Sequence, residues 1–220
     1  MYVVFFDLDG VLIDSRPAIA SCLRATLAGF GLARPDDAEL DAVIGPPLGD
    51  GFARLLARRG ASLSLVPACV DAFRASYGEV AVAGTALQAG IAEVLPRLRA
   101  RAVLSIATSK PQHLADPIVE ALGIRNWFEA VVGPSHDHDG ESKSGTLERA
   151  IAATEAGLGT TVATAWKAFV GDRKHDIVAA REHAVYAIGA TWGYGSEDEL
   201  RRAGAQAIVY RPLDLLGLLP

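Results

Sequence analysis

The chain has 220 residues, of which 50% are hydrophobic, and a formal net charge of -5 at pH 7. This composition is enough for one substantial core, with or without a smaller inserted unit, and it excludes a disordered or fibrous chain. No run of Lys and Arg approaches the basic stripe that nucleic-acid binding needs, so we expect no nucleic-acid partner.

The sequence carries no sign of an oxidising or membrane environment. The two cysteines, Cys22 and Cys69, lie in helix-like patterns and are too few for a disulfide framework, so we expect buried thiols in a reducing compartment. The start of the chain lacks the basic region and the long apolar run of a signal peptide, and no stretch reaches membrane-spanning length. We therefore predict a cytoplasmic protein that does not associate with membranes.

Apolar runs typical of buried strands recur along the chain and mostly alternate with helix-like segments. This alternation predicts an α/β fold, a Rossmann-like parallel sheet with helices on both faces, whose ligand crevice lies at the carboxyl ends of the strands. Pro96 and Pro117 fall inside helical stripes of this core, so those helices either start late or kink. The expected strands are Tyr2–Phe6, Ala102–Ala107, Ala130–Val132, Ala168–Val170, Tyr186–Ala190 and Ala207–Tyr210.

The stretch that follows the first strand breaks the alternation, because it has helical periodicity only. A helix is expected after Ser15, with Pro17 in its first turn and Gly31 at its end, and further apolar helical stripes follow. We interpret this stretch as an α-helical cap domain inserted over the crevice. The predicted division is a core domain of residues 1–15 and 84–220 and a cap domain of residues 16–83.

Polar side chains suited to chemistry stand at four places that a parallel sheet would bring to one crevice. Two acids spaced like Asp7 and Asp9 are expensive to bury together unless a cation compensates them, which indicates a metal site. The four places are Asp7 to Gly10 after the first strand, Thr108 to Lys110 after the second, Lys143 at the start of a helical segment, and Asp172 to Asp176 after Ala168–Val170.

FDLDGVLIDS, ATSK, Lys143 and VGDRKHDI resemble the four ordered motifs of the haloacid dehalogenase (HAD) superfamily, over nearly the whole chain. The later run IGATWGYGSEDELRRAGAQAIV is similar to the phosphoglycolate phosphatase and 5'-nucleotidase-like members that carry a small helical cap. By the family pattern, dehalogenases and phosphonatases replace the second acid of the first motif. Because Asp9 is present here, the resemblance favours a phosphatase or a phosphomutase.

These residues fit phosphoryl transfer through an aspartyl-phosphate. Asp7 is expected to attack phosphorus, and Asp9 to protonate the leaving alkoxide and later take a proton from the attacking water. The Thr108 hydroxyl is expected to hold the phosphoryl oxygens, and Lys143 to neutralise charge on Asp7 and on the transferring group.

The expected cofactor is Mg2+, a hard cation that prefers oxygen ligands. Its expected ligands are Asp7 and Asp172, the resemblance adds the backbone carbonyl of Asp9, and Asp176 is assigned to the metal site in a supporting role. The predicted substrate-binding residues are Thr108, Ser109, Lys143, Gly10 and Arg16.

Some residues have an alternative interpretation from the sequence. Arg16 and Lys110 are candidates to pair a second anionic group of the substrate, although each is also what an exposed linker or helix charge looks like. The loop around Trp192 and Tyr194 is either a rim of the crevice or a packing element. His136 to Asp139 resembles a metal-binding tract, but a solvated loop is the better interpretation of its spacing.

Together these features predict a Mg2+-dependent phosphomonoester hydrolase of the HAD superfamily, similar to phosphoglycolate phosphatase, that acts on a small phosphorylated metabolite. A phosphomutase or a 5'-nucleotidase on the same fold is the alternative enzyme. A catalytically silent phosphate-binding module and a protein that works through the surface of its helical cap are alternatives from other classes, because a fold does not establish a function.

Overall fold

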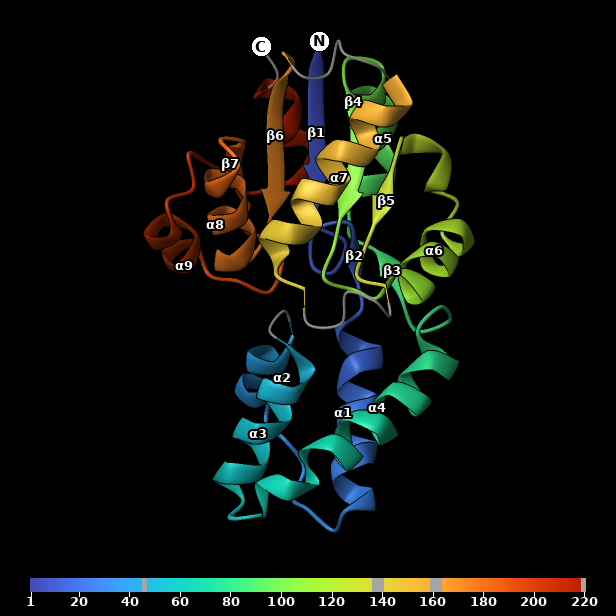
Figure 1. Ribbon diagram of the computed structural model, residues 1–220, viewed down its shortest axis with the longest axis vertical. Helices are drawn as coiled ribbons and strands as arrows, with labels where there is room; N and C mark the ends of the chain where they lie inside the picture. The colour runs from blue at the N-terminus through green and yellow to red at the C-terminus, as the bar shows by residue number, and fades with distance from the viewer. Residues whose placement is uncertain (45–46, 136–140, 159–163, 219–220) are drawn as a thin grey trace. The chain divides into compact units, whose positions relative to one another are not determined.

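The computed structural model describes residues 1–44, 47–135, 141–158 and 164–218 (Figure 1). Over these ranges the chain forms two compact units, a core unit of residues 1–14 and 86–220 and a helical unit of residues 15–85. None of the helices described there is long and apolar enough to cross a membrane.

The core unit is built on a parallel sheet with the strand order β5-β4-β1-β6-β7-β8 (Figure 1). β1 lies between β4 and β6, and the strand order reverses beside it, which is where ligands bind in open α/β sheets. The predicted α/β fold is confirmed, with each expected strand present to within two residues at either end. The strands are β1 Tyr2–Phe6, β4 Val103–Ala107, β5 Val131–Val132, β6 Trp166–Gly171, β7 Tyr186–Ala190 and β8 Ala207–Val209.

Both faces of the sheet are buried. Val3 and Phe5 of β1 pack in one apolar cluster with Leu147 of α7 and Ile177 of α8, and Figure 1 shows α7 running across this face. Alternate side chains of a strand point to opposite faces, and Val4 and Phe6 on the other side of β1 are buried as well. Fully burying such a side chain contributes about 1.5–3 kcal/mol, so this packing holds the strand ends in place. The core helices are α5 Ile91–Arg99, α6 Gln112–Ala121, α7 Lys143–Leu158, α8 Lys174–Glu182 and α9 Glu197–Ala203.

Two interior prolines test the expected helix starts. Pro96 lies inside α5 and Pro117 lies inside α6, each past the first turn of its helix. The alternative of a late helix start is therefore wrong for both segments. Each helix continues through its proline although the proline cannot donate a backbone hydrogen bond.

A short antiparallel pair follows the first strand. β2 Ile13–Asp14 pairs with β3 Ala86–Leu87, so the chain leaves the core unit and returns to it along adjacent strands. Gln88 extends this connection, because its backbone N–H donates to the carbonyl of Leu12.

The helical unit contains the segments in which the sequence shows only helical periodicity. Cys22 and Cys69 are buried free thiols in it, as predicted. Glu39 accepts hydrogen bonds from two nitrogens of the Arg59 guanidinium at 3.0 and 2.8 Å, and these bonds lower the pKa of Glu39 to about 2. The helices are α1 Arg16–Gly29, α2 Asp37–Val43, α3 Leu48–Arg58 and α4 Val66–Val80.

Candidate active site

The carboxyl ends of three adjacent strands bring the predicted site residues to one edge of the sheet. Asp7 follows β1, Thr108 follows β4 and Asp172 follows β6. The backbone N–H of Asp7 donates to the carbonyl of Val170 at 2.9 Å, which continues the β1–β6 ladder into the site. Lys143 is the first residue of α7, which packs against β4 and β5.

Asp7 and Lys143 form the shortest ion pair of the site. The Lys143 ammonium lies 2.6 Å from Oδ1 of Asp7 and 3.0 Å from Oδ1 of Asp176, and it also lies over the Phe169 ring. Burial raises the pKa of Asp7 to about 7, an effect that Lys143 only partly offsets. Burial alone would lower the pKa of Lys143, but the carboxylates of Asp176 and Asp7 outweigh it and raise that pKa. Lys143 therefore stays charged at neutral pH.

Asp172 is fully buried, and its two carboxyl oxygens differ. Oδ2 accepts a hydrogen bond from the backbone N–H of Tyr194 at 2.6 Å, whereas Oδ1 is, among the described residues, a buried side-chain oxygen without a hydrogen-bond partner. Burial raises the pKa of Asp172 well above its ordinary value, and the nearby Asp176 and Asp7 add to that rise. An acceptor in this position favours a bound cation.

Glycines make room for the Asp172 side chain. A Cβ at Gly10 or Gly193 would contact the Asp172 carboxylate closer than atoms normally approach. Gly10 also has a φ of 85°, a left-handed conformation that side chains rarely adopt. Gly10 is thus required for the packing around Asp172, and its carbonyl accepts a hydrogen bond from Gln88 at 3.2 Å.

The acidic cluster fits a divalent metal ion. Asp7, Asp172 and Asp176 each offer a carboxylate oxygen, and these oxygens lie within 4.8 Å of one another. Oδ1 of Asp172, which has no hydrogen-bond partner within the described ranges, supplies the ligand atom that such an ion needs. Four carboxylates and two ammonium groups give the immediate cluster a formal charge of -2 when all are ionised, which one divalent cation balances: Asp7, Asp9, Asp172, Asp176, Lys110 and Lys143.

Asp176 already has partners for both oxygens. Oδ1 lies 3.0 Å from the Lys143 ammonium, and Oδ2 accepts a hydrogen bond from the backbone N–H of Arg173 at 3.0 Å. Asp176 therefore holds the Lys143 ammonium and the start of α8, and its predicted supporting role at the metal site stays a prediction.

Asp9 is paired with a lysine that the sequence did not link to it. The Lys110 ammonium lies 3.0 and 3.2 Å from the two carboxyl oxygens of Asp9. Thr108 is buried, and its hydroxyl oxygen accepts a hydrogen bond from the backbone N–H of Lys110 at 3.1 Å. Ser109, between them, is exposed. The only hint of this pair in the sequence is that Lys110 stands two residues after Thr108, and so near the end of the same strand.

The structure assigns contacts to two further predicted features, of which the loop around Trp192 and Tyr194 lies against Asp172. Arg16 belongs to the helical unit, where its guanidinium donates to Asp41 at 2.8 Å and lies 3.4 Å from Asp37. The loop around Trp192 and Tyr194 packs in the core unit, where the indole N–H donates to the carbonyl of Val11 and the Tyr194 hydroxyl donates to Asp14. His136 to Asp139 lies outside the described residues.

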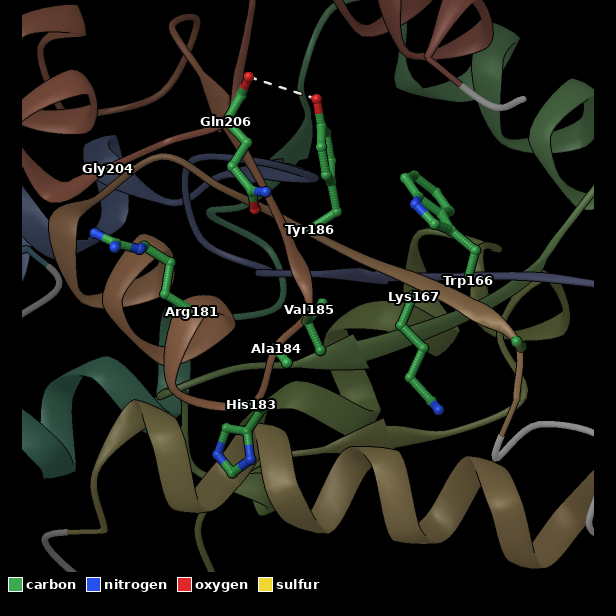
Figure 2. A pocket seen from close by; sticks show the side chains of 10 residues that line it. Trp166, Lys167, Arg181, His183, Ala184, Val185, Tyr186, Gly204 and Gln206 are labelled. Atoms are coloured by element: carbon green, nitrogen blue, oxygen red, sulfur yellow. Dashed lines mark hydrogen bonds between the residues drawn. The ribbon is translucent and has the colours of Figure 1, made fainter.

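A hollow in the core unit lies at the opposite, amino ends of the strands (Figure 2). Its volume is about 870 Å3, and its lining includes Trp166 and Lys167 at the start of β6, Tyr186 at the start of β7, and Arg181 and His183 near the end of α8. None of the clustered acids lines it. The hollow is therefore separate from the acidic cluster at the carboxyl ends.

Comparison with known proteins agrees with this geometry. A family model described as haloacid dehalogenase-like hydrolase matches residues 4–190. The chain is 34% identical over 204 residues to a phosphoglycolate phosphatase from Xanthomonas campestris, covering 90% of this chain and 87% of the relative. It is 33% identical over 199 residues to a 5'-nucleotidase from Pseudomonas aeruginosa, covering 90% and 86%. It is also 31% identical over 209 residues to the tyrosine-protein kinase PtkA from Mycobacterium tuberculosis, covering 94% and 68%.

A solved structure shows the same fold. The haloacid dehalogenase-like family protein SP0104 from Streptococcus pneumoniae superposes with a TM-score of 0.87 at 26% identity, over 99% of this chain and 98% of that one. The prediction of an enzyme of the phosphatase type with this α/β fold is confirmed by these matches. The chain belongs to the haloacid dehalogenase-like hydrolase family.

Proposed function

We propose that the chain is a Mg2+-dependent phosphomonoester hydrolase that acts on a small phosphorylated metabolite. The observation that carries the proposal is the pairing of Asp7 with Lys143 at 2.6 Å, near an Asp172 oxygen that has no hydrogen-bond partner in the described part of the chain. The proposed nucleophile, a buried positive charge and a candidate metal ligand thus lie together in a buried site. These are the parts that phosphoryl transfer needs.

The reaction is proposed to proceed in two displacements. A carboxylate oxygen of Asp7 attacks phosphorus, the P–O ester bond breaks, and the carboxyl group of Asp9 gives its proton to the leaving alkoxide. Asp9 then takes a proton from a water molecule, whose oxygen attacks phosphorus and releases inorganic phosphate and free Asp7. Lys143 and the Thr108 hydroxyl hold the oxygens of the transferring group throughout.

A bound Mg2+ would be held by Asp7, Asp172 and the backbone carbonyl of Asp9, and it would reduce the repulsion between the nucleophile and the phosphate. Burial favours the protonated form of Asp7. A cation bound to its carboxylate would favour the ionised form instead. A protonated Asp7 cannot attack phosphorus.

The class of substrate is proposed from the relatives. One relative is named a phosphoglycolate phosphatase and another a 5'-nucleotidase, so small phosphomonoesters of either kind are the first candidates. We propose that the helical unit, residues 15–85, acts as the cap that selects among them. Arg16 and Ser109 remain candidate substrate contacts, and phosphomutase remains the alternative within the same chemistry.

A second candidate function is transfer of the phosphoryl group to the hydroxyl group of an acceptor molecule instead of to water. The observation that favours it is the 31% identity to a protein named a tyrosine-protein kinase, over 94% of this chain. Asp9 would then remove the proton from the accepting hydroxyl instead of from water.

The test is phosphate release from phosphoglycolate, sugar phosphates and nucleoside monophosphates, with MgCl2 or with excess chelator, for the wild type and Asp7→Asn. We expect turnover that needs the metal and is lost in the variant. Full activity in chelator would contradict the metal requirement, and an active Asp7→Asn protein would contradict the covalent mechanism. Binding of inorganic phosphate without any turnover would instead favour the silent phosphate-binding module.

A further inference from the structure

The two acids of the first motif each have a lysine of their own. Lys143, from the start of α7, contacts Asp7, whereas Lys110, from the segment after β4, contacts Asp9. The Lys110 side chain is 3% exposed, although lysine is among the residues least often fully buried. Burying a lysine ammonium costs desolvation free energy, so a role at the protein surface does not explain this position.

The Lys110–Asp9 contact is held from both sides. The Lys110 ammonium lies within 3.2 Å of both oxygens of Asp9, so it restrains the rotation of the whole carboxyl group. The Lys110 backbone is fixed in turn by its hydrogen bond to Thr108 and by the close approach of Gly133, where a Cβ would collide with the Lys110 carbonyl. The restraint on Asp9 therefore comes from a rigid neighbouring strand end.

We propose that Lys110 is a positioning residue that holds the carboxyl group of Asp9 in the orientation needed for proton transfer to the leaving group and from water. This inference rests on the proposed function, because it assigns Asp9 that role. It differs from an interpretation of Lys110 as a contact for a second anionic group of the substrate. An ammonium group has three donors and accepts none, so it can hold Asp9 in both protonation states through the remaining oxygen lone pairs.

The leaving group gives a selective readout. An alkoxide needs a proton as it leaves, whereas p-nitrophenolate is stable without one, so a misplaced Asp9 should slow the cleavage of alkyl phosphates much more than that of p-nitrophenyl phosphate. A displacement of about 1 Å in such a group costs on the order of 100-fold in rate. A variant that disturbs the fold of the site would instead slow the cleavage of both kinds of substrate equally.

The experiment compares kcat/KM for ethyl phosphate, p-nitrophenyl phosphate and phosphoglycolate in the wild type, Lys110→Met and Lys110→Arg. Lys110→Met keeps the aliphatic volume and removes the charge, and we expect about a 100-fold loss on ethyl phosphate but less than about a 5-fold loss on p-nitrophenyl phosphate. Lys110→Arg keeps the charge and should regain part of the ethyl phosphate turnover. The matched control is Lys167→Met, which removes a lysine with 14% side-chain exposure that pairs with Glu155 at the amino end of β6.

A second readout follows the hydrolysis of the aspartyl-phosphate, which also needs Asp9. Lys110→Met should release a burst of p-nitrophenol equal to the enzyme concentration, followed by a slow steady state, because only the second displacement is then limiting. Equal losses on all three substrates without a burst would overturn the proposal in favour of a structural role. A loss confined to phosphoglycolate would overturn it in favour of a substrate-anion contact. Absence of turnover in the wild type would overturn the proposed function and this inference with it.

Discussion

Replacing Asp7 by Asn is expected to stabilise the metal-free protein at neutral pH while it removes turnover. The pKa of Asp7 is raised from 3.8 to about 7, chiefly by burial, so the folded protein binds a proton at this site that the unfolded chain has already lost. Stability from this group is therefore fully present below pH 3.8 and is lost as the pH rises through about 7. At about 1.4 kcal/mol per pH unit, the loss amounts to about 4 kcal/mol.

Asn avoids this loss because it has nearly the shape of the protonated carboxyl group and does not titrate. Its amide oxygen can still accept from Lys143, which also keeps its contact with Asp176 at 3.0 Å. The measurement is urea unfolding of the wild type and Asp7→Asn in excess chelator from pH 5 to pH 8, with Asp71→Asn, which removes an exposed acid of α4, as the control. The free-energy advantage of Asp7→Asn should widen by about 3 kcal/mol over this range. An advantage that stays constant with pH, or an Asp7→Asn protein that is less stable at pH 8, would refute the reasoning.

The remaining predictions concern the metal site, its supports and the helical unit. Asp172→Asn should abolish the heat of Mg2+ binding in calorimetry, and an unchanged affinity would remove Asp172 from the ligand set. Gly193→Ala should weaken Mg2+ binding about tenfold with the fold retained by circular dichroism, because its Cβ would displace the Asp172 carboxylate. Lys143→Met should lower the unfolding free energy at pH 7 by about 3–5 kcal/mol, since it leaves buried carboxylates without their cation; an unchanged urea midpoint would contradict this. Glu39 has a pKa lowered to about 2, so its stabilisation is present above 4.5 and is lost as the pH falls through about 2. Glu39→Gln should cost about 1.5–3 kcal/mol at pH 7, as expected for hydrogen bonds between charged side chains that are only 10% exposed, and progressively less as the pH falls through about 2, as measured by urea unfolding.

The fold was predictable because its signals are local. A buried parallel strand is a short apolar run, and both Tyr2–Phe6 and Tyr186–Ala190 appear as such runs in the sequence and as β1 and β7 in the structure. The places of Asp7, Thr108 and Asp172 follow from the same pattern, since each directly follows a strand or is its close neighbour. Their roles in catalysis and metal binding remain predictions.

Contacts between distant residues were not predictable in this way. Lys110 and Asp9 are 101 residues apart, and Tyr194 and Asp172 are 22 apart, so no periodicity links them. The sequence left Lys110 open between a contact for a second anionic group and an exposed helix charge, because nothing local indicates its burial or its pairing with Asp9. The sequence left the loop around Trp192 and Tyr194 open between a rim and a packing element. The structure shows that the lack of a Cβ at Gly193, within this loop, leaves space for the Asp172 carboxylate.

In the proposed mechanism a phosphoryl group moves to Asp7, but the acidic cluster does not determine which hydroxyl takes the group away. Water, a sugar hydroxyl and a tyrosine hydroxyl would all give their proton to Asp9, and the relatives carry names for phosphatase, nucleotidase and kinase activity alike. Water is far more concentrated than any other acceptor, so transfer to another hydroxyl requires a pocket that excludes it. We therefore expect phosphate to be the main product when the enzyme hydrolyses p-nitrophenyl phosphate in the presence of glycerol or a tyrosine peptide. Measuring p-nitrophenol and phosphate together gives the partition, and an excess of p-nitrophenol over phosphate, matched by phosphorylated acceptor, would show that the enzyme is a transferase.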